Sequence, residues 1–232
     1  MRSLEELIRE QTNLSVTQVA HLQHLASDWQ LIADLSFADL AIWVPIKDSG
    51  FIAMSHVRAA TAATVFPKDF EGEIRADLPS GESVESFPIA FNGQVIAQLN
   101  RHRNPMVTRS LGRLESTYQE IAQQLIEMVG EGTFPFDFAI SSLNPSPRVG
   151  DGFIRLDRSG VIIYASPNGR SAFSRLGWEG ELEGIQLVDV ANGISGESMN
   201  TLTEKISAND VAQVVLESRG GVVELTILPL LK

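Results

Sequence analysis

The stretch Asp151–Trp178 constrains the fold more than any other part of the chain. Two short apolar runs, 153–156 and 161–165, lie on either side of a turn-forming segment. The second run is rich in the β-branched residues that are typical of strands. Ser166 or Asn168 is then available to cap a following helix. The order predicts a β-hairpin and a short helix that folds back over a small sheet.

This segment resembles the opening of a PAS sensor domain. The matching residues are the turn Asp157–Gly160 and the helix start at Asn168, which is followed by Ala172 and Phe173. An ordinary hairpin and helix of another α+β domain is the alternative. The resemblance implies a cup that holds a ligand or is filled by its own side chains. The candidates for lining it are Phe153, Tyr164, Asn168, Phe173 and Trp178.

The composition limits the classes of function. The net charge of −11 comes without any basic stripe, which argues against nucleic acid or an anionic membrane surface as a partner. The absence of cysteine excludes disulfides, thiolate metal sites and cysteine nucleophiles. No apolar run reaches the roughly 18 residues that a membrane span needs. We expect a cytoplasmic protein without a metal site and with no certain cofactor.

The amino-terminal half predicts helices around an antiparallel sheet. A first helix is expected near residues 4–8 and a longer one over 16–33, where apolar residues recur at helical spacing. Strands are expected at 40–44 and 51–55, and residues 57–82 have no clear pattern. Asn92-Gly93 lies between two apolar runs, which predicts a hairpin with a type I′ turn.

A closing helix is expected over residues 108–129. Its apolar residues repeat every three or four positions, as in coiled coils and bundles. The candidates for a dimer seam are Leu111, Leu114, Tyr118, Ile121, Leu125 and Met128. The alternative is that this stripe packs on the sheet of its own domain.

The proline-rich stretch 131–150 predicts a linker, because proline interrupts both helices and strands. We therefore expect a sensor domain over 1–130 and a second one over 151–232, truncated before its last strand. The fold class is α+β for both.

Helix, central sheet with an Asn-Gly hairpin, and long closing helix resemble a GAF domain. The segments SDWQLIADLSFADLAIWV, EGTFPF and NPSPRVGDGFIRLD resemble the amino-terminal region of actinobacterial cytosolic sensor histidine kinases. In that family a GAF domain, a PAS domain and a kinase core follow one another, and the response regulators act by antitermination on RNA. The resemblance implies a homodimer that signals through a kinase core to a response regulator.

None of the four histidines has the sequence context of a phosphoacceptor, and no phosphate-binding glycine motif occurs. His21 and His24 share a helix side, but no third metal ligand is evident. His102, between Arg101 and Arg103, is interpreted as an exposed strand end that could meet a phosphate. No carboxylate pair or catalytic triad is found.

The sequence therefore predicts a sensory region that performs no catalysis itself and relays a signal to an absent histidine kinase core. A small ligand between the sheet of the first domain and residues 57–85 would be one input. The first alternative is an interaction module without a ligand, and the second is an enzyme of unknown type.

Overall fold

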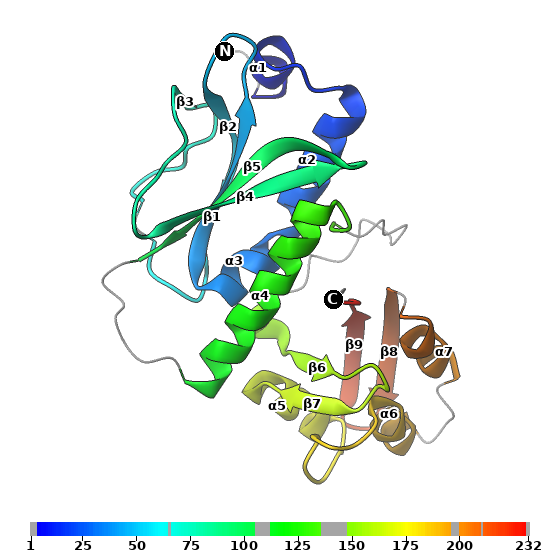
Figure 1. Ribbon diagram of the computed structural model, residues 1–232. Helices are drawn as coiled ribbons and strands as arrows, with labels where there is room; N and C mark the ends of the chain where they lie inside the picture. Colours follow the sequence, from blue (N-terminus) through cyan, green and yellow to red (C-terminus); the bar gives the residue numbers. More distant parts are fainter. Residues whose placement is uncertain are drawn as a thin grey trace. The chain divides into compact units, whose positions relative to one another are not determined.

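The chain divides into two compact units, which are described separately. A computed structural model describes residues 4–64, 66–104, 112–135, 148–195, 200–209 and 211–230. Unit 1 comprises the described residues up to Pro135 and unit 2 those from Arg148 onward (Figure 1). Most of the predicted linker lies outside the described residues, and the predicted domain limits remain predictions.

Unit 1 is built on a five-stranded antiparallel sheet with the order β3-β2-β1-β5-β4. Its strands are β1 Ala38–Pro45, β2 Phe51–Val57, β3 Ile74–Arg75, β4 Val84–Phe91 and β5 Gln94–Arg103. Both faces of β1 are buried, which indicates that the sheet is covered on each side. The fold class is α+β, as expected.

The Asn-Gly hairpin is confirmed. Asn92 and Gly93 join β4 to β5 with φ values of 50° and 76°, and positive φ at both positions is what a type I′ turn requires. This turn fixes the register of the strands on which the candidate site is built.

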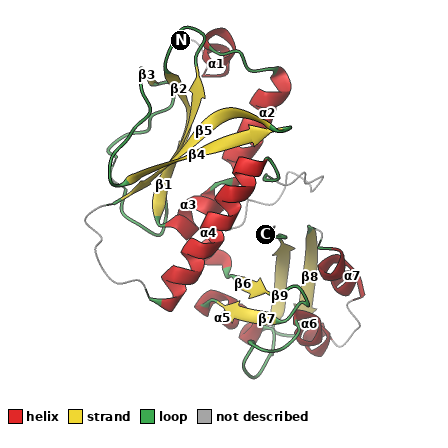
Figure 2. Ribbon diagram, viewed as in Figure 1, coloured by secondary structure: helices red, strands yellow, loops and turns green. Residues whose placement is uncertain are grey.

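The helices of unit 1 are α1 Leu4–Gln11, α2 Val16–Asp28, α3 Gln30–Ser36 and α4 Arg113–Glu131. Helix α4 packs on α3 and β4, and Figure 2 shows both helices on one face of the sheet. The prediction of one continuous helix over 16–33 is wrong, because the chain turns at Trp29. The Ser27 hydroxyl donates to the carbonyl of His24 at 2.7 Å, a local bond that favours bending of a helix.

The opposite face of the sheet is covered by the segment of residues 58–64 and 66–83, called here the covering segment. Phe66, Phe70 and Leu78 of this segment pack against Trp43 and its sheet neighbours Ala41 and Ala53. The described residues between β2 and β4, where the sequence had no clear pattern, thus form a loop with the short strand β3 in it.

Unit 2 contains two separate two-stranded antiparallel sheets. Its elements are η1 Val149–Asp151, β6 Ile154–Leu156, β7 Ile162–Ala165, α5 Pro167–Arg175, α6 Leu187–Ser195, α7 Asn200–Ala208, β8 Ala212–Ser218 and β9 Gly221–Ile227. The hairpin β6–β7 followed by a helix is confirmed. Ser166 is the residue that caps α5, since its hydroxyl accepts from the Gly169 N–H at 3.1 Å.

The core of unit 2 lies between its helices and strands and includes Ile162, Phe173, Leu187 and Leu216. The turn between β8 and β9 lies against the end of α5. A Cβ atom on Gly220 would collide with the carbonyl oxygen of Arg175, so this position requires glycine.

Candidate ligand-binding site

The face of the sheet that lies under the covering segment carries polar side chains from three strands. Asp39 of β1 pairs with His102 of β5, and Ala41 pairs with Asn100 on one side and His56 on the other. Because alternate residues of a strand point to the same face, these side chains form one layer beneath the covering segment.

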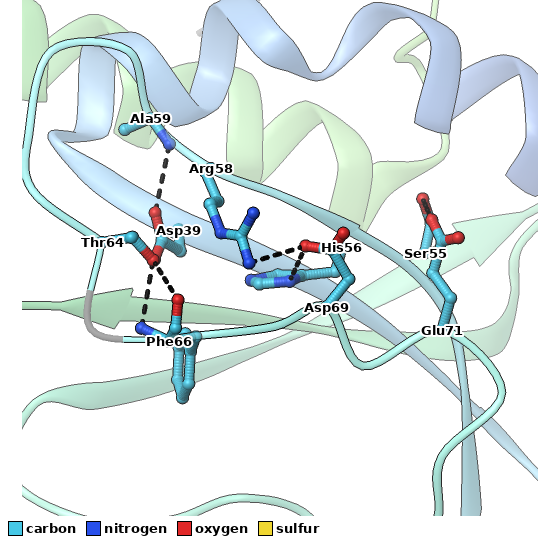
Figure 3. Close-up of polar contacts among 9 residues, drawn as sticks. All are labelled: Asp39, Ser55, His56, Arg58, Ala59, Thr64, Phe66, Asp69 and Glu71. Atoms are coloured by element: carbon cyan, nitrogen blue, oxygen red, sulfur yellow. Dashed lines mark hydrogen bonds and ion pairs between the residues drawn. The ribbon is translucent and has the colours of Figure 1, made fainter.

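Asp39 fastens the covering segment to the sheet. One oxygen of its buried carboxylate accepts from the backbone N–H of Ala59 at 3.1 Å, and the other accepts from the hydroxyl of Thr64. The same hydroxyl oxygen accepts from the N–H of Phe66 at 3.1 Å (Figure 3). One carboxylate thereby positions the start of the segment and the first aromatic ring of the site.

A second carboxylate, on Asp69, joins the segment to the sheet edge. It lies 3.2 Å from Nδ1 of His56 and 3.1 Å from a guanidinium nitrogen of Arg58 (Figure 3). A carboxylate only accepts, so Nδ1 of His56 donates. Burial lowers the pKa of His56, although the carboxylates of Asp39 and Asp69 act in the opposite direction.

The histidines and the aromatic rings of the segment pack together. His56 stacks on Phe70 with ring centres 4.4 Å apart, and Phe66 meets His102 edge-on at 4.9 Å. The two phenylalanine rings are themselves 4.4 Å apart. The imidazole rings from β2 and β5 and the two phenylalanine rings of the covering segment therefore form one aromatic wall.

A cavity of about 320 Å³ opens beside this wall. Its lining includes Phe66, Phe70, Arg75, Pro79, Val84 and His102. A more open hollow of about 430 Å³ shares Phe66, Phe70 and Arg75 with it. The volume of the first cavity, about 320 Å³, falls at the lower end of the range for small-molecule sites.

The interpretation of His102 as an exposed strand end is wrong, because only 4% of the residue is exposed. Burial lowers its pKa to about 4, and His56 acts in the same direction while Asp39 opposes it. Arg101, expected in the same exposed cluster, is also buried and binds Glu85 at 2.9 Å. His102 was missed because its cover comes from residues 66–84, far away in the sequence.

The comparisons with known proteins agree on one kind of protein. Residues 4–82 match the family "Histidine kinase PdtaS, GAF domain". Over 99% of its length the chain is 35% identical to the sensor histidine kinase PdtaS of Mycobacterium tuberculosis and 32% identical to that of Mycolicibacterium smegmatis. A solved structure described as the sensor region of a sensor histidine kinase superposes with a TM-score of 0.87 at 36% identity, covering 100% of this chain and 93% of the other. This chain belongs to the family of sensor histidine kinase sensor regions.

The sensor region spans about half the length of the curated relatives it matches, 53% in each case. The GAF resemblance of the amino-terminal part is confirmed, and the cavity lies in unit 1, which contains the matched segment. In the described part of the chain no helix is both long and apolar enough to cross a bilayer.

The predicted pocket residues of unit 2 do not all face the same surroundings. Phe173 is buried in the core and Trp178 packs against that core. Phe153 and Tyr164 are half-buried, whereas Asn168 is exposed and donates to the Gly150 carbonyl at 2.9 Å. A PAS-type ligand site in unit 2 of the sensor region stays a prediction.

The predicted dimer seam packs inside unit 1. Tyr118, Ile121, Leu125 and Met128 of α4 are buried within a single chain, and Leu114 is half-buried. Tyr118 also stacks on Phe37 at 6.2 Å. Leu111 lies outside the described residues. The four buried residues therefore form part of the domain core and present no exposed seam, so they do not support the dimer that the sequence pattern suggested.

His21 and His24, weighed as a metal pair, have other contacts. The ring of His21 lies 4.7 Å from that of Phe91, and Nε2 of His24 lies 3.3 Å from the carboxylate of Asp28. Among the described residues no group of three or more potential ligands could hold a metal ion.

Proposed function

We propose that unit 1 receives a small-molecule signal in its cavity and that this signal controls a histidine kinase core in the complete protein. The observation that carries the proposal is the cavity between the sheet and the covering segment, with buried His102 in its wall. Carboxylates of Asp39 and Asp69 hold this segment. A ligand in the cavity would therefore move the covering segment by breaking or shifting the few hydrogen bonds and ion pairs made by these two carboxylates.

Strand β5 offers a route from the cavity to α4. His102 faces the cavity, and the preceding residue Arg101 faces the other side of the sheet. Arg101 donates to Glu85 at 2.9 Å and to Gln123 of α4 at 3.3 Å. A shift of β5 would therefore displace α4. A coupling free energy of about 1–3 kcal/mol between ligand binding and the position of this helix suffices for regulation.

The kinase activity in the remaining parts of the proposal rests on the relatives, and the domain limits, the location and the homodimer rest on the sequence resemblance described above. The complete protein would transfer a phosphoryl group from ATP to its own histidine and then to a response regulator, in the cytoplasm. Unit 2 would be a PAS-like domain over 151–232, joined by a linker over 131–150 to the GAF domain over 1–130. The complete protein would be a homodimer, which light scattering would test.

The experiment fills the cavity. Ser83 lines it, so Ser83→Trp places a large ring there. In the complete kinase we expect this variant to change the rate of autophosphorylation by about fivefold or more. The neighbouring Glu82 is exposed, and Glu82→Trp is the matched control that should retain the wild-type rate. Equal rates for wild type and both variants would contradict signal reception in this cavity.

A further inference from the structure

The cavity of unit 1 is lined by basic side chains and by no acidic one. Its eight lining residues include Arg75, Ser83, His102 and Arg103, and the other four are apolar. The low pKa of His102, about 4, leaves this imidazole neutral at physiological pH. Two guanidinium groups are therefore the charged groups of the lining, in a chain whose net charge is −11.

Arg103 has fewer bonds than the neighbouring Arg101. Arg101 donates to Glu85 at 2.9 Å and to Gln123 at 3.3 Å. A terminal nitrogen of Arg103 lies 3.3 Å from the same oxygen of Glu85, and its buried Nε has no hydrogen-bond partner among the described residues. Burial lowers the pKa of Arg103, Arg101 acts in the same direction, and Glu85 opposes both. One carboxylate thus serves two guanidinium groups.

The guanidinium group of Arg103 is accessible to a ligand. Arg103 is the last residue of β5, and 43% of its side chain is exposed. Since Nε is buried, a ligand would bind the terminal nitrogens. These nitrogens donate in a fixed planar arrangement that matches the two oxygens of a carboxylate.

Two carboxylates near the cavity already have donors of their own. Glu73 accepts from Nε of Arg75 at 2.7 Å. The buried carboxylate of Asp39 accepts from the Ala59 N–H and the Thr64 hydroxyl. Neither carboxylate belongs to the lining. A negatively charged ligand in the cavity would therefore contact guanidinium groups and no carboxylate.

The apolar part of the lining suits an aromatic ring. The rings of Phe66 and Phe70 lie 4.4 Å apart, and Pro79 and Val84 add apolar surface. A volume of about 320 Å³ is at the lower end for small-molecule sites, which favours a ligand with a single ring.

We infer that the cavity takes a small aromatic carboxylate with one negative charge, and that this carboxylate binds the terminal guanidinium nitrogens of Arg103. A single charge matches the cluster of Arg101, Arg103 and Glu85, which has two cations and one anion. This inference rests on the proposed function, because it names the class of ligand for the same cavity. The two are nevertheless tested by different measurements.

The first test compares three probes that share one ring and differ in charge: benzoate, benzamide and benzamidine. Each is titrated by calorimetry into the complete 232-residue chain at pH 7.5. We expect benzoate to bind about tenfold or more tightly than benzamide, because a hydrogen bond between two charged groups is stronger than one to a neutral group. Benzamidine should bind no better than benzamide. Equal or tighter binding of benzamide or benzamidine overturns the inference.

A second test places the probe. Ser83 lines the cavity, and Ser83→Trp should reduce benzoate affinity about tenfold or more by occupying the space. Ser80→Trp, at an exposed position outside the lining, is the uncharged control and should retain the parent affinity. Unchanged benzoate affinity in Ser83→Trp would place the probe outside the cavity and overturn the inference.

A third test concerns the contact with Arg103. Arg103→Gln should reduce benzoate affinity about tenfold and leave benzamide affinity unchanged, so that the preference for the charged probe is lost. Arg9→Gln removes the same charge from an exposed position of α1 and should keep the preference. A preference for benzoate that persists in Arg103→Gln would overturn the contact.

The opposite change should have the opposite effect. Glu85→Gln keeps an oxygen that can accept from Arg101 and removes the negative charge that Arg103 shares. We expect benzoate to bind this variant more tightly than the parent chain, which a purely structural role of Arg103 does not predict. Unchanged or weaker binding would overturn the contact. If either variant fails to fold, the probe series on the unmodified chain remains decisive.

The outcomes separate the two proposals. If Ser83→Trp changes autophosphorylation but benzoate is not preferred, the cavity is a signal site and the ligand class is wrong. If benzoate is preferred and Ser83→Trp prevents its binding but leaves autophosphorylation unchanged, the ligand class is supported and the proposed function is wrong.

Discussion

Asp39 connects the sheet to the segment that covers the cavity, so its removal should loosen that segment before anything else. Asp39→Ala leaves the Ala59 N–H and the Thr64 hydroxyl without their acceptor. We expect unfolding free energy to fall by about 2–3 kcal/mol. Hydrogen exchange in residues 58–72 should rise more than in β4 and β5.

The control for this substitution is Asp48→Ala, which removes an exposed carboxylate in the turn between β1 and β2. It should change neither stability nor exchange measurably. Exchange that rises uniformly over unit 1 in Asp39→Ala would show that Asp39 supports the whole sheet and does not act on the covering segment in particular.

His102 predicts a pH dependence of stability. Its pKa is about 4 in the folded chain, below the ordinary value of 6.5, so the unfolded chain binds the proton first as the pH falls. The contribution of His102 to the unfolding free energy is therefore complete above pH 6.5 and is lost as the pH falls from 6.5 to 4. This contribution is at most about 3 kcal/mol. The charged or titratable groups acting on it are His56, Asp39 and Arg75.

The measurement is urea unfolding at pH 7.5, 6 and 5 for the parent chain and for His102→Gln, which cannot titrate. In both chains Trp178→Phe leaves the fluorescence to the two tryptophans of unit 1. We expect the parent to lose more stability than His102→Gln as the pH falls. Parallel losses would show that His102 is not the group responsible.

At the scale of elements, α4 is a core helix. Leu125 is 1% exposed, so Leu125→Ala should reduce the unfolding free energy by about 2–5 kcal/mol. Ser116→Ala, at an exposed position of the same helix, should be nearly neutral. If Leu125→Ala instead halves the mass measured by light scattering without loss of stability, the residue belongs to an interface between chains.

Elements with a local signal were predictable from the sequence. Asn92-Gly93 adopts the positive φ values that only a few residue types tolerate readily, and Ser166 caps α5 as expected. The break at Trp29 could not be predicted, because apolar spacing continues through it. The bond from Ser27 to the carbonyl of His24 shows the competing local preference.

At the scale of the whole molecule, the sequence predicted two units and the family, but not the cavity wall. His102 appeared in a run of basic residues, but the rings of Phe66 and Phe70, distant in the sequence, pack against it in the folded chain. The closing helix shows the same limit. A seam pattern records that a helix is buried on one side, but not whether the partner is its own sheet or a second chain.

Unit 2 carries two hairpins, β6–β7 and β8–β9, that share no strand pairing within the described residues. Residues 184–187 bond to the outer edge of β7, whereas no strand of the described residues pairs with the outer edges of β6, β8 and β9. Unpaired strand edges adhere to other extended chains. In concentrated solution, unit 2 could associate through its main chain with no involvement of any helix. A measured mass above that of one chain would then result from association of strand edges. Substitutions at those edges would distinguish this association from a signalling dimer.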